Sequence, residues 1–292
     1  MRSGDRSWAG ERLWPLVAVV ALLPAACASD APLNPSFPLR LADAKADLRR
    51  MRESPRLPAR PVVVVTGLFD LGLAAEALAD ELRRVLADDA PVLPVSLDGT
   101  WTPEDARRRV IEAVEAAFPS DDPRWTAEVD VVGVSLGGVV ARDAAVDHGP
   151  GQKRLRIARL FTIASPHRGC PNATAPTLDE RIVALRPGSE FLRRLDAALA
   201  DAEYEIVPYV RLGDRVVGAV NAGIGDRPAY WVPTGPLEFA HAAASDDPRI
   251  IADIARRLRG ERAWTVPPPS PLPDGETPDP PPPETDTLLL FP

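Results

Sequence analysis

The stretch from residue 129 to residue 138 reads Val-Asp-Val-Val-Gly-Val-Ser-Leu-Gly-Gly. Its first six residues are rich in valine and predict a strand, and residues 136–146 predict a helix. Ser135 lies at the junction, in the pattern G-x-S-x-G. In such a turn the strand and the helix approach closely, so the residues two before and two after the serine must be small, as Gly133 and Gly137 are. The stretch predicts a strained turn that lifts the Ser135 hydroxyl above a sheet.

Strands and helices alternate on both sides of this turn. The run Val62–Val65 predicts a strand buried on both faces, and Thr102–Asp105 predicts a helix start with a capping threonine followed by proline. Further strands are expected at 91–97, 160–164 and 205–212, and further helices at 73–86, 190–200 and from Asp247 onward. This alternation predicts an α/β fold with a mostly parallel central sheet and helices on both faces.

Ser135 is the candidate nucleophile of a serine enzyme. The helix that follows it points backbone N–H groups and its positive dipole end at a developing oxyanion. The N–H of Leu136 is one expected oxyanion donor, and the N–H of Leu68, in the loop after the first strand, is the other. Leu68 and Phe69 are also candidates for an acyl pocket. The alternative is a turn that needs its glycines for packing and happens to contain a serine.

A serine hydroxyl needs a general base, and the base needs an acid that orients it. In a fold of this kind the acid and then the histidine follow the serine. His241 is the only one of three histidines late enough in the chain for this order. Asp214 follows a predicted strand and is the candidate acid. Gly213–Asp214 is also turn chemistry, and Asp226 and Glu238 are competing acids.

The two remaining histidines have simpler interpretations. His167 lies in Ser165–Gly169, directly after a strand, where it could contact substrate or brace the site. A histidine held by backbone hydrogen bonds in a tight loop is the commoner outcome. His148 precedes Gly149 at a helix end, and a cap formed by a left-handed glycine explains it without a functional role.

Together these segments resemble the lipase and serine-esterase branch of the α/β-hydrolases. The resemblance rests on five segments that span about two hundred residues: 62–67, 133–138, 161–169, 213–214 and His241. One departure is Thr66, because many relatives have His-Gly where this chain has Thr66–Gly67. The resemblance implies hydrolysis of carboxylic esters, often lipid or acyl esters, without a metal or an organic cofactor.

Two other functions remain open at this stage. An acyltransferase would form the same acyl-enzyme and pass the acyl group to a bound alcohol. A non-catalytic binding module of the cell envelope would keep the fold alone, but it has no need of the complete order of serine, acid and histidine.

The two ends of the chain predict export and a tail. Residues 1–27 combine a basic start, a short apolar run and small residues before Cys27, as a secretory signal does. Cys27 also resembles a lipidated cysteine, which would attach an exported bacterial protein to a membrane; the alternative is periplasmic release after plain cleavage. Residues 28–60 are expected to form a linker with one short helix, 61–264 the hydrolase domain, and 265–292 a disordered proline-rich tail.

The net charge of the chain bears on the kind of partner that it binds. The chain of 292 residues has a formal net charge of −8, which argues against a nucleic acid as partner. A small-molecule or lipid ester is the expected partner.

Overall fold

The computed structural model describes residues 33–68 and 73–276. The chain divides into two units, Met1–Ala31 and Pro32–Pro292, and all the described residues belong to the second. The predicted signal segment and Cys27 therefore lie outside the described residues, as does Phe69.

The described residues form one parallel sheet of six strands in the order β2-β1-β3-β4-β5-β6. The strands are β1 (Val62–Val65), β2 (Val92–Val95), β3 (Trp125–Val134), β4 (Arg154–Ile163), β5 (Glu205–Arg211) and β6 (Tyr230–Val232). The chain starts in the interior of the sheet, moves outward to β2 and then crosses β1 to reach β3. The loops after β1 and β3 therefore diverge, and ligands bind parallel sheets at such a switch point, beyond the carboxyl ends of the strands. We call this side of the sheet the carboxyl edge.

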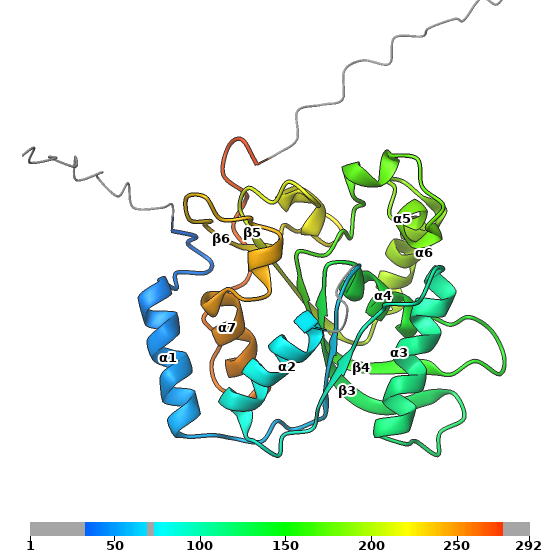
Figure 1. Cartoon of the computed structure of the whole chain (residues 1–292), viewed down its shortest axis with the longest axis horizontal. Helices are drawn as coiled ribbons and strands as arrows, with labels where there is room; N and C mark the ends of the chain where they lie inside the picture. Colours follow the sequence, from blue (N-terminus) through cyan, green and yellow to red (C-terminus); the bar gives the residue numbers. More distant parts are fainter. Residues whose placement is uncertain (1–32, 69–72, 277–292) are drawn as a thin grey trace, which may run out of the picture. The chain divides into compact units, whose positions relative to one another are not determined.

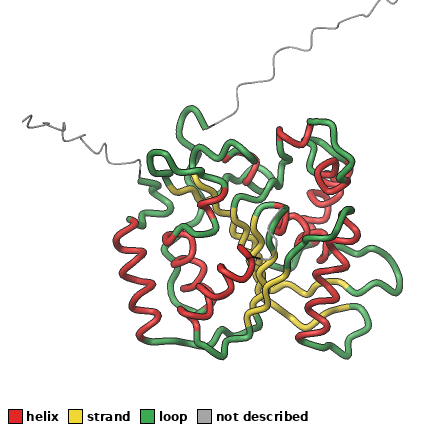
Figure 2. The backbone as a smooth tube through the Cα atoms, in the orientation of Figure 1, coloured by secondary structure: helices red, strands yellow, loops and turns green. Residues whose placement is uncertain are grey.

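Helices cover both faces of the sheet (Figure 1). One face packs against α1 (Leu41–Glu53), α2 (Leu73–Leu86) and α7 (Pro248–Leu258). The other packs against α3 (Pro103–Ala117), α4 (Leu136–Ala145) and α6 (Glu190–Ala197), with the short α5 (Glu180–Ala184) beside them. Figure 2 shows the strands between these two layers. The predicted fold class is confirmed.

The valines of β1 explain how the sheet divides the core. Val62 and Val64 belong to the cluster with α1, α2 and α7, while Val63 and Val65 belong to the cluster with α3 and α4. Successive side chains of a strand point to opposite faces, so a strand covered on both sides must be apolar at every position.

The predicted linker and tail differ from the structure. Residues 33–60 are part of the domain, because Phe37, Leu48 and Met51 are buried in the core beside α7. The start of the predicted tail is also attached: the N–H of Thr265 donates to Asp253 (2.9 Å) and that of Val266 donates to the carbonyl of Ser36 (2.8 Å). Residues 277–292 lie outside the described residues.

Candidate active site

Ser135 occupies the turn between β3 and α4 in a strained conformation. Its φ of +51° with ψ of −125° lies outside the regions that residues other than glycine favour. The turn is held from one side, since the N–H of Ser135 donates to the carbonyl of Ile163 at the end of β4 (2.8 Å). This geometry places the serine at the carboxyl edge, as the sequence predicts.

The glycines around the serine leave no room for a side chain. A Cβ on Gly133 would lie 2.4 Å from the Cα of Gly138, and a Cβ on Gly137 would lie 2.1 Å from the carbonyl oxygen of Val65. Both contacts are far inside van der Waals distance and involve backbone atoms that cannot turn aside. The close packing of β1, β3 and α4 therefore requires glycine at these positions.

The structure brings Asp214, His241 and Ser135 into one line of contacts. Nδ1 of His241 lies 2.8 Å from Oδ2 of Asp214, and Nε2 of His241 lies 3.2 Å from Oγ of Ser135. The other carboxylate oxygen of Asp214 accepts the N–H groups of Val216 (2.9 Å) and Val217 (3.0 Å). A carboxylate can only accept, so Nδ1 carries the proton and Nε2 is free to take one from the serine.

The segment that carries His241 is tied to the end of β5. Arg211, the last residue of β5, is buried and donates to the carbonyl of Ala243 (3.2 Å). The same guanidinium pairs with Glu238 and lies 3.4 Å from Asp247, the N-cap of α7. Arg211 thus holds both sides of the segment in which His241 lies.

A comparison with solved structures finds distant likenesses to this chain. The product of the gene lin2722 from Listeria innocua is 14% identical, covers 71% of this chain and 96% of that chain, and has a TM-score of 0.50. Phospholipase PlaB from Legionella pneumophila is 15% identical over 68% of this chain and 58% of that chain (TM-score 0.44). The NocB thioesterase domain is 21% identical over 69% of this chain and 95% of that chain (TM-score 0.39). No protein-family model matches the sequence, and a search of curated proteins gives no match.

The chain has an α/β-hydrolase fold. At these identities the likeness concerns the fold alone. The arrangement of Ser135, His241 and Asp214 comes from the chain's own geometry, which is independent of any neighbour.

The two competing acids lie away from His241. Glu238 pairs with Arg211 and accepts the N–H of Gly235 (3.1 Å), and these two contacts, the backbone one first, lower the pKa of its carboxyl group. Asp226 is exposed in the loop that leads into β6. Asp214 is the acid in contact with His241.

His167 does not reach a substrate pocket, and that prediction is wrong. Its side chain is buried, Nδ1 accepts from Arg142 (3.2 Å), and Nε2 donates to the hydroxyl of Thr162 (3.0 Å). Burial first, and then the charges of Arg142 and Arg168, hold its pKa well below the usual value. The ring is a neutral brace beneath the nucleophile turn. The sequence suggested backbone hydrogen bonds for this ring, whereas side chains hold it.

His148 has a structural role, but the predicted glycine cap is wrong: α4 ends at Ala145, and the extended Val146, three residues before Gly149, is its cap. Its ring bridges Nη1 of Arg107 (2.7 Å) and the carbonyl of Asp143 in the last turn of α4 (2.9 Å). Gly149 follows with a φ of +103°, a conformation that glycine adopts without strain.

The loop after β1 runs against the nucleophile turn. A Cβ on Gly67 would lie 3.3 Å from both Oγ of Ser135 and the backbone nitrogen of Leu136. The loop that carries Leu68 therefore lies against the turn that carries Leu136, because Leu68 follows Gly67 directly. The sequence analysis did not single out Gly67 for this close approach, although its place after a buried strand was a usable signal.

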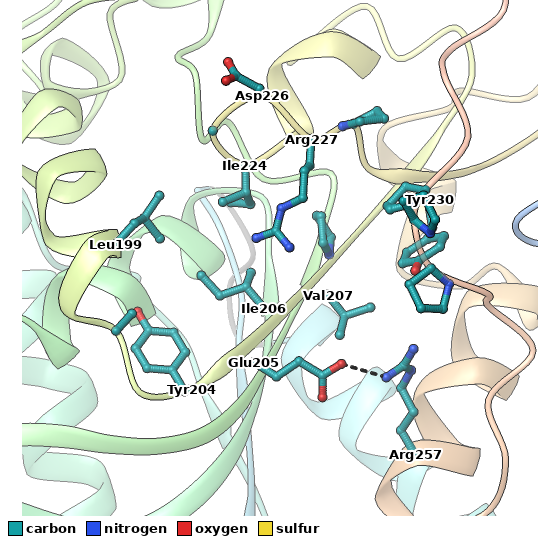
Figure 3. Close-up of a pocket in the computed structure, with 17 residues that line it drawn as sticks. Leu199, Tyr204, Glu205, Ile206, Val207, Ile224, Asp226, Arg227, Tyr230 and Arg257 are labelled. Atoms are coloured by element: carbon teal, nitrogen blue, oxygen red, sulfur yellow. Dashed lines mark hydrogen bonds and ion pairs between the residues drawn. The ribbon is translucent and has the colours of Figure 1, made fainter.

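A pocket of about 660 Å³ lies away from these residues (Figure 3). It is lined by the start of β5, the loop before β6 and residues 267–269, with the Glu205–Arg257 ion pair (3.0 Å) on one side. The residues that line it include no serine, cysteine or histidine, so it offers no serine or cysteine nucleophile and no histidine base. In the described part of the chain, no group of three or more His, Cys, Asp or Glu side chains is placed to hold a metal ion.

Proposed function

We propose that this protein is a serine hydrolase that cleaves carboxylic esters through an acyl-enzyme on Ser135. The observation that supports it is the unbroken line of contacts from Asp214 through His241 to Ser135. A general base within hydrogen-bond reach of a strained, presented hydroxyl is the arrangement that nucleophilic catalysis needs.

Acylation starts when the Ser135 oxygen attacks the ester carbonyl carbon and its proton moves to Nε2 of His241. The carbonyl oxygen becomes an oxyanion, for which the N–H groups of Leu136 and Leu68 are the proposed donors. His241 then gives its proton to the alkoxy oxygen as the carbon–oxygen bond breaks, and the alcohol leaves. Asp214 stays ionised and stabilises the imidazolium.

Deacylation repeats these steps with water. His241 takes a proton from a water molecule, whose oxygen attacks the acyl carbon, and then returns that proton to Oγ of Ser135. The products are the free acid and the restored enzyme. The proposed substrates are lipid or acyl esters, the class that the resemblance to lipases and serine esterases implies.

Labelling with a fluorophosphonate probe tests the proposal. The wild-type chain should be labelled, and the Ser135→Ala and His241→Ala variants should not. Ser245→Ala is a matched control, because Ser245 is a half-buried serine only four residues after His241. Label that persists on Ser135→Ala would overturn the assignment, and an unlabelled wild-type chain would favour the binding module.

Hydrolysis of p-nitrophenyl butyrate separates the two enzymes that share this intermediate. A hydrolase releases butyrate, whereas an acyltransferase offered a second alcohol gives an excess of transferred ester.

We also propose that the protein is exported and attached to a membrane through Cys27. The support is the order of basic, apolar and small residues before this cysteine. Labelled palmitate fed to producing bacteria should enter the wild-type chain and not the Cys27→Ser variant. An unlabelled wild-type chain would favour plain cleavage.

A further inference from the structure

The sheet is incomplete beside the first half of β5. β6 has only three residues, and its first residue, Tyr230, pairs with Tyr209. Among the described residues, the part of β5 before Tyr209 therefore has β4 on one side and no strand on the other. The pocket of about 660 Å³ lies at this place, since residues 204–208 are part of its lining. Its volume is within the range of small-molecule sites.

The uncovered side of β5 is a poor place for a further strand. Successive residues of a strand point their backbone groups to opposite sides, and the N–H of Leu212 donates to Val232 of β6 (2.9 Å). By this alternation, Ile206 and Pro208 point their backbone groups into the pocket. Pro208 has no N–H, so this edge lacks a donor that an added strand would need. A small molecule is therefore a better occupant than an extended peptide.

A tight turn presents one cation to the pocket. Ile224 and Arg227 exchange two backbone hydrogen bonds (2.9 and 3.0 Å), and Gly225 between them has a φ of +54°. Arg168 holds this turn by donating to the carbonyl of Gly225 (2.6 Å). The backbone of Arg227 is thus fixed, while its side chain extends into the pocket toward Ile206 (Figure 3).

The charge of Arg227 has no counter-charge among the residues that line the pocket. Glu205 and Arg257 pair with each other (3.0 Å), and no such contact joins the guanidinium of Arg227 to any of the lining residues drawn in Figure 3. Asp226 is exposed and points away from that guanidinium. A planar guanidinium suits a carboxylate, which brings one negative charge. A phosphate group would bring a second charge, and Arg257 is already engaged by Glu205.

Side chains with rings line much of the remaining pocket. They are Tyr204, Tyr230, Pro208, Pro228 and the prolines at 267–269. We propose that this pocket binds an aromatic carboxylate, with the carboxylate on Arg227 and the ring against the tyrosines and prolines. Aromatic rings gain from such contacts beyond the apolar area that they bury. The lining contains none of Ser135, Asp214 and His241, so this site is separate from the proposed active site.

Calorimetric titration of 2-naphthoate into the full chain tests the site. We expect a Kd of about 0.1 mM, which corresponds to a moderate affinity for a ligand of this size. 2-Naphthamide has the same shape without the charge and should bind about 10-fold more weakly, and Arg227→Gln should weaken 2-naphthoate by about the same factor. Arg262→Gln, at an exposed arginine outside the pocket, is the control and should bind as the wild type does.

Treatment with the fluorophosphonate separates this site from the proposed active site. The treated chain should bind 2-naphthoate with an unchanged Kd, and loss of binding would overturn the proposal by placing the ligand at Ser135. Absence of binding, equal binding of 2-naphthamide, or normal binding by Arg227→Gln would also contradict it. Decanoate that bound more tightly than 2-naphthoate would rule out the aromatic class. A chain that binds 2-naphthoate through Arg227 but is not labelled by the fluorophosphonate would overturn only the proposed function.

Discussion

The absence of a side chain on Gly67 leaves space beside Ser135, the proposed nucleophile. Its hydrogen faces the nucleophile, and a methyl group there would lie 2.9 Å from Cβ of Ser135 as well as close to Oγ and to the N–H of Leu136. We expect Gly67→Ala to lower kcat/KM for p-nitrophenyl butyrate about 100-fold or more, because it fills the space in which an oxyanion would form. Steady-state kinetics on the purified variant measure this.

Gly149→Ala is the control for that substitution. A Cβ there meets no atom within 4 Å, although the φ of +103° strains it, so it should cost about 1 kcal/mol of stability and leave kcat/KM unchanged. Gly67→Ala with normal activity would mean that the loop after β1 lies away from the reacting atoms.

His167 links the nucleophile turn to pH. Because its folded pKa is depressed by burial, the unfolded chain binds a proton below about pH 6.5 that the folded chain does not. Stability is therefore full above that pH and is lost as the pH falls, by about 1.4 kcal/mol per pH unit until the folded ring is protonated. Urea unfolding between pH 5 and 7 should show this loss, and His167→Gln should flatten it. Parallel pH profiles of the two proteins would contradict the neutral brace.

Among the elements, the segment from β6 to α7 carries His241 and is short of regular structure. Arg211 holds this segment in place through contacts with Ala243, Glu238 and Asp247. We expect Arg211→Lys to lower kcat about 10-fold with little change in KM, because one ammonium cannot meet contacts in three directions and His241 loses its alignment. The rate of pre-steady-state labelling by the fluorophosphonate should fall by the same factor as kcat. Arg227→Lys is the control for this substitution and should leave kcat unchanged, since Arg227 is exposed in the loop before β6.

Elements with local signals were predictable from the sequence. The helix predicted at 73–86 matches α2, and the hydroxyl of Thr102 accepts the N–H of Asp105 (3.0 Å) at the predicted start of α3. β6 was missed because it has only three residues and pairs with Tyr209–Arg211, far away in the sequence. β4 begins at Arg154, six residues before the prediction, because its charged residues find partners on β3, such as Asp130 for Arg159.

In the candidate site, too, the features that have a local signal in the sequence could be predicted, and those that depend on distant contacts could not. The order of Ser135, Asp214 and His241 could be predicted, because a parallel sheet brings the ends of its strands to one edge. The burial of His167 could not, since it depends on Arg142, which lies 25 residues earlier on α4. Arg211 was equally hidden, because its partners come from a segment without a periodic pattern.

At the scale of the whole molecule, α1 near the start of the domain contacts α7 and the segment after it, near the domain's end. Asp47 on α1 accepts from Arg256 on α7 and from the indole of Trp264 (2.9 Å). Burial is the largest single influence on the pKa of its carboxyl group and raises it, but the hydrogen bonds together outweigh burial, so the pKa is lowered. We expect Asp47→Ala to cost about 2 kcal/mol of stability, since it leaves these donors without an acceptor. Urea unfolding at pH 7 measures it. An unchanged midpoint would mean that the helices are held by their apolar contacts alone.

The segment predicted as a linker gives the strongest test of where the domain begins. Phe37, Leu39, Leu48 and Met51 are buried in the core, and burying such side chains is worth about 1.5–3 kcal/mol each. Their sum, roughly 6–12 kcal/mol, is comparable with the whole stability of a typical domain. A chain that begins at residue 33 should therefore unfold cooperatively in urea and react with the fluorophosphonate, whereas a chain that begins at residue 61 should do neither. If the shorter chain unfolded at the same urea concentration as the longer one, α1 would be an accessory to a core that is complete without it.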